Sequence, residues 1–167
     1  SKPSNWRSKT SLDDFLIENE IIGISEVDTR EITTLLREKG AMNCCIASSS
    51  LITKEEAISA AKDFDGLKGM DLAKVVSTES KYEWNKGIWP KNKNSDESFS
   101  VVAYDYGIKE NILRLLTEHV GKVHVVNAKT PFEEIIKLNP KGIFLSNGPG
   151  DPEPCDYAIE NIKKCLM

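Results

Sequence analysis

The segment Ile143-Phe144-Leu145-Ser146-Asn147-Gly148-Pro149-Gly150-Asp151-Pro152 decides the fold of this chain. An apolar run leads into a turn with two glycines, and a helical pattern begins near Asp156. At the carboxyl end of a strand in an open α/β sheet, such a turn presents backbone N–H groups to a ligand. Because only fifteen residues follow Pro152, we expect the loop to form half of a site whose other half lies outside residues 1–167.

The alternation of strands and helices extends back from this loop to Phe99. Three apolar runs predict buried strands, at 99–104, 123–126 and 143–146. Each is followed by a helical pattern, beginning at Lys109, Thr130 and Asp156 respectively. This order is typical of a parallel, doubly wound sheet. We therefore predict an α/β fold in which residues 99–167 form the first three strands of an open, mostly parallel sheet, with the third strand central in the complete sheet.

The first 86 residues predict a mixed α/β region. Capping patterns, each with an acidic residue three positions later, predict helices that begin at Ser11, Asp28 and Thr53. The runs Ile21–Val27 and Asn43–Ala47 predict strands. Residues 87–98 are polar and lack periodicity, which indicates a linker. The predicted organisation is therefore a scaffold piece in 1–86, a linker in 87–98 and the start of a sheet domain in 99–167.

Composition excludes several classes of protein. The 22 basic and 26 acidic side chains give a net charge of −4, unlike the basic footprint of a nucleic-acid binder. No apolar run reaches the ~18 residues of a membrane span, and the amino terminus lacks the apolar core of a secretory signal. The chain has four cysteines, Cys44, Cys45, Cys155 and Cys165, and no CxxC pair. This pattern favours reduced thiols in a cytoplasmic protein over a zinc site or disulfides.

The glycine loop carries the strongest chemical signal. Gly148 and Gly150 permit positive φ and lack the Cβ atoms that would block close backbone approach, while Pro149 stiffens the chain between them. Neighbouring N–H groups held in this way can stabilise an oxyanion or bind a carboxylate or phosphate. From the residues alone, a purely structural tight turn is an equally good interpretation.

Other candidate residues give weaker signals. The turn Asp105–Lys109 lies at the same predicted sheet edge, but a structural role is favoured over ligand binding. Neither His119 nor His124 has the neighbours that mark a catalytic triad. Cys155 lies near the loop, where a nucleophile could sit, but its context favours a packed thiol.

Four stretches of the chain resemble a known family. VVAYDYGIKENILRLL (101–116) and GIFLSNGPGDPEPCDYA (142–158) resemble the small subunit of glutamine-dependent carbamoyl-phosphate synthase, of the class I glutamine amidotransferase family. VDTREITTLLREKGAMNCCIA (27–47) and GLKGMDLAKVV (66–76) resemble the amino-terminal domain of the same subunit. The resemblance implies that 1–86 is the later part of that amino-terminal domain and 99–167 the first part of the amidotransferase domain.

The resemblance also implies an activity. In this family the small subunit hydrolyses L-glutamine and sends ammonia through a tunnel to a large subunit. There ammonia, bicarbonate and ATP, with Mg²⁺, form carbamoyl phosphate for arginine and pyrimidine biosynthesis. By resemblance, the Gly148 N–H helps form the oxyanion hole and Gly150 contacts the bound glutamine. No cofactor or metal is implied for this chain itself, because ATP and Mg²⁺ belong to the large-subunit partner.

One departure from the family pattern limits these expectations. The family's nucleophilic cysteine lies in a GxCxGxQ motif on the next strand, followed later by its His and Glu partners, and residues 1–167 contain no such motif. Cys155 instead matches the family's PCDYA segment. We therefore expect an internal fragment that is inactive alone and that self-associates or is locally disordered in 99–167. Two alternatives remain: a non-catalytic module that binds a phosphate or carboxylate at Gly148–Gly150, and a structural domain that contacts a synthetase chain.

Overall fold

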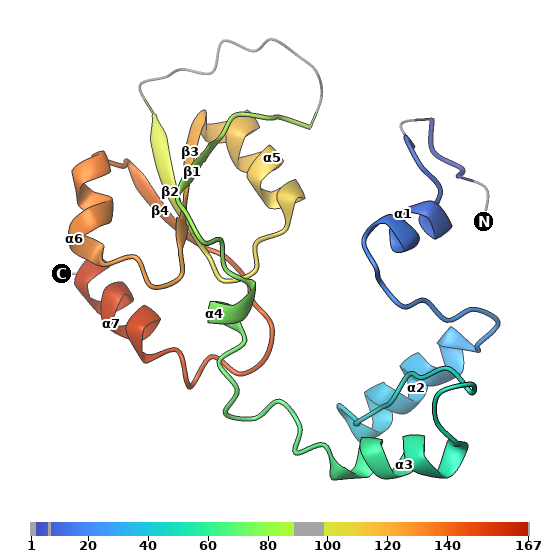
Figure 1. The fold of residues 1–167 in the computed structure, drawn as a ribbon. Helices are drawn as coiled ribbons and strands as arrows, with labels where there is room; N and C mark the ends of the chain where they lie inside the picture. The colour runs from blue at the N-terminus through green and yellow to red at the C-terminus, as the bar shows by residue number, and fades with distance from the viewer. Residues whose placement is uncertain (1–2, 7, 89–98, 167) are drawn as a thin grey trace. The chain divides into compact units, whose positions relative to one another are not determined.

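The computed structural model describes residues 3–6, 8–88 and 99–166, and the chain forms two compact units, Ser1–Gly66 and Leu67–Met167. The first unit contains three helices, shown in blue to green in Figure 1: α1 (Leu12–Glu18), α2 (Thr29–Lys39) and α3 (Lys54–Asp63). Each begins where its capping pattern predicts. The side chains of Ser11, Asp28 and Thr53 accept hydrogen bonds from the backbone N–H three residues later.

The two strands predicted for the first unit are wrong. Ile21–Val27 and Asn43–Ala47 have no strand assignment, and no other strand exists in the described part of Ser1–Gly66. A β-branched run becomes a strand only when a neighbouring strand receives its backbone hydrogen bonds. Glu26 adopts a φ of 60°, which also interrupts an extended backbone.

The second unit contains a four-stranded sheet in the order β1-β3-β2-β4. Strands β2 (Ser100–Asp105), β3 (Lys122–Asn127) and β4 (Gly142–Leu145) are parallel, with Val102 opposite both His124 and Ile143. The three predicted strands and the mostly parallel, open sheet are therefore confirmed. The edge strand β1 (Tyr82–Trp84), which the sequence did not predict, pairs antiparallel with β3.

The predicted division into 1–86, 87–98 and 99–167 remains a prediction. Residues 89–98 of the predicted linker lie outside the described residues. In the structure, the compact unit that contains the sheet begins at Leu67, and β1 joins that sheet from before the predicted linker.

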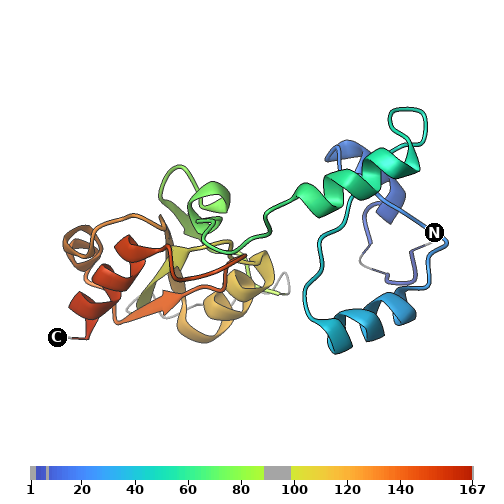
Figure 2. The same ribbon diagram turned by 90° about the horizontal axis from the view of Figure 1, so that it is seen from below.

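Helices cover both faces of the sheet, as a doubly wound fold requires. Figures 1 and 2 show α5 (Glu110–Val120) on one face, and α6 (Phe132–Ile135) and α7 (Asp156–Cys165) on the other.

Two apolar clusters fill the interfaces between the sheet and these helices. Beneath α5, fully buried Ala103, Val123 and Val125 pack with Leu113. On the opposite face, Val102, Tyr104 and Val126 pack with Ile135 and Ala158, and Ala73 of α4 (Ala73–Val76) joins them.

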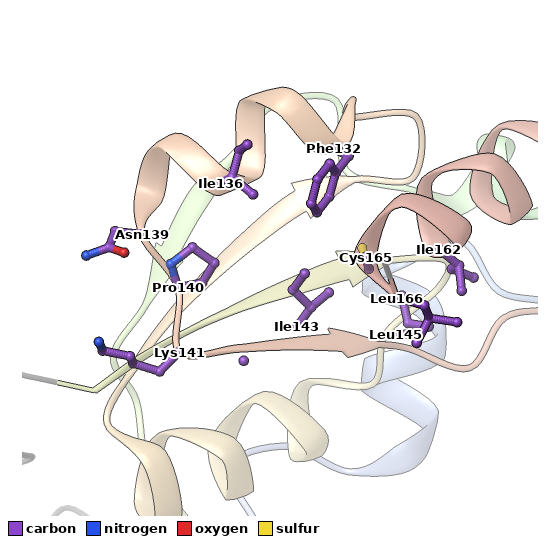
Figure 3. A pocket seen from close by; sticks show the side chains of 11 residues that line it. Phe132, Ile136, Asn139, Pro140, Lys141, Ile143, Leu145, Ile162, Cys165 and Leu166 are labelled. Carbon is purple, nitrogen blue, oxygen red and sulfur yellow. The ribbon is translucent and has the colours of Figure 1, made fainter.

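Strand β4 forms an open edge of this sheet. Within the described residues it pairs only with β2, although it carries the glycine loop. A cavity of about 560 Å³ lies beside it. Figure 3 shows Ile143 and Leu145 of β4 facing this space with Phe132, Ile136 and Ile162 from the helices. Apolar surface along an unpaired strand is suited to association with another strand.

A polar cluster ties α7 to the segment before α4. Asp71, whose side chain is 9% exposed, accepts hydrogen bonds from the Tyr157 hydroxyl at 3.1 Å and the Cys155 thiol at 3.6 Å. The Lys74 N–H donates to the same carboxylate at 3.2 Å. Desolvation opposes the charge on Asp71, but these hydrogen bonds outweigh it and lower the pKa of the carboxyl group.

This cluster predicts a pH-dependent contribution to stability. Because the folded pKa of Asp71 is lowered, the stabilisation is present above the unfolded value near 3.8 and is lost as pH falls through the folded value. We expect Asp71→Asn to lower the free energy of unfolding by about 1–3 kcal/mol at pH 7. The difference from wild type should shrink below pH 4, as measured by urea unfolding.

The matched control is Glu134→Gln, which neutralises an exposed carboxylate on α6 of the same unit. This variant should follow the wild-type curve within about 0.5 kcal/mol. If Asp71→Asn lost the same stability at pH 3 as at pH 7, the charge on Asp71 would not be what stabilises the cluster.

Candidate functional site

The candidate site is the loop that follows β4, where it meets the turn that follows β2. A Cβ atom at Gly107 would lie 3.2 Å from Cδ of Pro149 and 3.7 Å from Cα of Gly148, so the two backbones are in close contact. Both segments leave the carboxyl ends of neighbouring parallel strands, which is the ligand-binding edge of such a sheet. The structure therefore brings together the two segments that the sequence assigned to this edge.

Asp105 organises the turn after β2. Its buried carboxylate accepts hydrogen bonds from the N–H groups of Gly107 and Ile108, both at 2.8 Å, and from the Thr78 N–H at 2.9 Å. The structural interpretation of the Asp105–Lys109 segment is confirmed for Asp105. Its carboxylate binds three backbone N–H groups of the same unit, so its role is to hold the turn. Lys109 is exposed and immediately precedes α5.

The segment around Thr78 crosses the same edge of the sheet. The Thr78 carbonyl accepts from the Asn127 side chain at 2.6 Å, and the Ser77 hydroxyl accepts from the Ala128 N–H at 2.8 Å. Together with the Thr78–Asp105 bond, these contacts connect the carboxyl ends of β2 and β3. The loop after β4 is left as the exposed part of this edge.

Position 148 requires glycine because a Cβ atom does not fit there, and not because its φ is unusual. A Cβ atom there would overlap with the carbonyl oxygen of Tyr106 and lie 3.1 Å from the Tyr106 Cβ. Gly150 differs, because its φ of 77° is in the left-handed region and an added Cβ would lie 3.1 Å from Cδ1 of Leu72. Gly148 thus permits the loop to lie directly on the backbone of Tyr106, and Gly150 permits it to pass close to Leu72.

The N–H groups of this loop are available to a ligand. Gly148 and Gly150 are exposed, and neither donates a backbone hydrogen bond to any acceptor in the described part of the chain. Free N–H groups on a rigid turn are suited to an oxyanion, a carboxylate or a phosphate. Because both residues are exposed, water can bind these N–H groups until a ligand replaces it.

A cavity of about 410 Å³ adjoins the loop. It is lined by the loop, by Tyr106, and by the side of α7 that carries Ala158 and Ile159. The Tyr106 hydroxyl is buried and has no partner within the described residues. Burial raises the pKa of Tyr106 to about 12, so the phenol is neutral near pH 7.

The other candidate residues do not form a catalytic set. Cys155 is the residue directly before α7, and its side chain is buried. Desolvation is the main cause that raises the pKa of its thiol. The interpretation of Cys155 as a packed thiol is confirmed, because its residue is only 8% exposed, lies in the core cluster and donates to Asp71. His124 lies in β3, 3.5 Å from the Glu83 carboxylate, and His119 lies in α5; neither lines the cavity beside the loop.

Two exclusions apply to the described residues. No group of three or more His, Cys, Asp or Glu side chains among residues 3–6, 8–88 and 99–166 could hold a metal ion. None of the helices described there is long and apolar enough to cross a membrane.

Sequence reasoning did not single out Ser146 or Tyr106. The Ser146 hydroxyl accepts a hydrogen bond from the Tyr106 N–H at 2.9 Å and donates to the Asn147 carbonyl at 2.8 Å. A polar side chain at the end of a buried strand, directly before the glycine turn, is the signal that could have indicated Ser146. Its partner is forty residues away, which the sequence pattern does not reveal.

Known families match both ends of the chain. Residues 1–46 match the model of the carbamoyl-phosphate synthase small chain, CPSase domain, and residues 102–167 match that of glutamine amidotransferase class-I. The second match covers most of β2, all of β3 and β4, and the glycine loop, but not β1.

Curated relatives match almost the whole chain. The carbamoyl phosphate synthase small chains of Pseudomonas syringae and Pectobacterium atrosepticum are each 54% identical to it over 98% of its residues, and that of Vibrio parahaemolyticus is 50% identical over the same share. The chain spans somewhat less than half of their length, 45%, 44% and 45% respectively. About half of its residues, along nearly its full extent, are identical to those of carbamoyl phosphate synthase small chains, so the chain is similar to the corresponding part of these proteins.

Proposed function

We propose that this chain is part of the glutaminase subunit of carbamoyl-phosphate synthase and supplies part of its oxyanion hole. The observation that carries the proposal is the pair of N–H groups at Gly148 and Gly150, which have no acceptor among the described residues and lie on a loop held against Tyr106. The substrate is L-glutamine, which Gly150 contacts. The family relationship supports this choice over other acyl donors.

The reaction is acyl transfer. A thiolate attacks the side-chain amide carbon of glutamine, and the electron pair of the C=O bond moves to oxygen. The Gly148 N–H donates to that oxygen, where negative charge develops. When the tetrahedral species collapses, the C–N bond breaks and the nitrogen leaves as ammonia after accepting a proton; water then hydrolyses the thioester to glutamate. The attacking thiol is outside residues 1–167, since no GxCxGxQ motif occurs in them.

The proposed partner is the large subunit of the synthase, in the cytoplasm. That subunit receives ammonia and uses ATP with Mg²⁺ to form carbamoyl phosphate, which arginine and pyrimidine synthesis consume. This chain itself needs no cofactor for its part, because its contribution is backbone N–H groups. The helical unit Ser1–Gly66 matches the small-chain domain at 1–46 and serves as scaffold or subunit contact.

A non-catalytic anion site is the second candidate. The N–H groups of Gly148 and Gly150, which lack acceptors in the described part of the chain, suit a phosphate or carboxylate as well as an oxyanion. Titration with inorganic phosphate, followed by amide NMR shifts of the two glycines, separates the candidates. Saturable binding without glutamine hydrolysis by the complete gene product would favour the anion module.

Replacement of Gly148 tests the proposed oxyanion hole. The Cβ of Gly148→Ala overlaps the Tyr106 carbonyl, so the loop must move away from its position. Loss of one such donor typically lowers kcat about 10²–10³-fold. We expect a decrease of that size in the glutaminase kcat of the enzyme that contains this segment, as measured by ammonia release.

The matched control is Gly142→Ala at the other end of β4. Its Cβ would meet only Cγ2 of Val101, at an ordinary 3.6 Å. This variant should keep kcat within about twofold, since no contact is strained. Unchanged glutaminase activity in Gly148→Ala, with the fold verified by circular dichroism, would contradict the oxyanion role.

The polypeptide of residues 1–167 is expected to be inactive alone. Its thiols include Cys155, which is buried and protonated, and none lies in the family's nucleophile motif. A coupled assay of the purified polypeptide with glutamine should detect no ammonia above the buffer control. Ammonia release that iodoacetamide abolishes would show that one of these four cysteines is a nucleophile after all.

We propose also that this polypeptide self-associates through β4. The strand has one unpaired edge within the described residues, and Leu145 on it is 41% exposed. Light scattering should show a mass that rises with concentration, and Leu145→Lys should reduce it. Ile58→Lys, on exposed α3, is the control. A single monomeric mass over the whole concentration range would contradict the proposal.

A further inference from the structure

We infer that Ser146 is a positioning residue that sets the direction of the Gly148 N–H. The inference rests on the proposed oxyanion role of Gly148 and adds a side chain to it. Ser146 is half-buried at the end of β4, where its hydroxyl contacts Tyr106 on one side and Asn147 on the other.

The two hydrogen bonds of Ser146 fix where its hydrogen lies. The Tyr106 N–H donates to Oγ at 2.9 Å and occupies one of its lone pairs. The single hydroxyl hydrogen is then free to point at the Asn147 carbonyl, 2.8 Å away. Ser146 therefore connects a fixed donor in the turn after β2 to an acceptor in the glycine loop.

That acceptor belongs to the same peptide unit as the Gly148 N–H. The Asn147 C=O and the Gly148 N–H lie in one plane and point in opposite directions, because the peptide is trans. When Ser146 holds the carbonyl oxygen, the N–H is directed to the other side. Without the hydroxyl, the peptide plane is less restrained, since glycine gives φ of residue 148 a broad allowed range.

Tyr106 holds the same peptide from a second direction. Its carbonyl oxygen occupies the space of a Cβ at residue 148, so the Gly148 Cα is already fixed beside it. The contact with Tyr106 does not set the orientation of the peptide plane, and Ser146 does. A donor that is already aligned stabilises the developing charge without reorganisation during the reaction.

The first test measures the Gly148 amide itself, on residues 1–167. In ¹⁵N relaxation, wild type should give a Gly148 order parameter typical of rigid backbone, about 0.85. Ser146→Ala should lower it below about 0.6 while the amides of β2 and β3 stay rigid. Ser146→Thr retains the hydroxyl and should restore the wild-type value. Ser59→Ala, which removes an exposed hydroxyl from α3, is the control.

The second test measures glutaminase kinetics in the complete enzyme that contains this segment. A misdirected donor weakens only the transition-state interaction, so Ser146→Ala should lower kcat about tenfold and leave KM within about twofold. Ser146→Thr should recover most of the loss. A change in KM alone would indicate a substrate contact in place of positioning.

The two tests separate the inference from the proposed function. If Ser146→Ala leaves the Gly148 order parameter unchanged, or if Thr fails to restore it, Ser146 does not position the amide. If the order parameter falls as expected but kcat does not, the inference about geometry holds and the oxyanion role of Gly148 is wrong.

Discussion

The backbone of Tyr106 holds the glycine loop, and the candidate site depends on this contact. Its carbonyl oxygen lies where a Cβ of residue 148 would be, and its N–H reaches the loop through the Ser146 hydroxyl. Tyr106 is itself fixed because Asp105 organises the turn that follows it and because its ring stacks on Tyr104, with centroids 5.9 Å apart. With the loop supported in this way, the Gly148 and Gly150 N–H groups have no acceptor among the residues that the structure describes.

The sheet explains why this support exists at this place. Parallel pairing of β2 with β4 sends both strands to the same edge, so the turn after one meets the loop after the other. Apolar clusters on the two faces keep the strands in register, and Asp71 attaches the start of α7 to the segment before α4. Strand β4 carries the loop although one of its own edges is unpaired among the described residues.

Local sequence signals predicted much of this fold, and contacts between distant residues account for the rest. The apolar runs of β2, β3 and β4 and the caps at Ser11, Asp28 and Thr53 are local, and the structure confirms them. Strand β1 is only three residues long and forms because it can pair with the edge of β3. The run Ile21–Val27 has no neighbouring strand to pair with and is not a strand. The glycines marked the loop, but Ser146 acts through Tyr106, forty residues earlier, so its role appears only in the structure.

A crystal structure of the complete enzyme with an aldehyde analogue of glutamine would test the proposed oxyanion hole most directly. The thiol adds to the aldehyde and forms a tetrahedral adduct whose oxygen stands for the oxyanion. We expect that oxygen about 2.7–3.1 Å from the Gly148 nitrogen, with the Asn147 carbonyl still bonded to Ser146. An adduct oxygen held by other donors, with the Gly148 N–H turned toward a protein carbonyl, would contradict the role proposed for this loop.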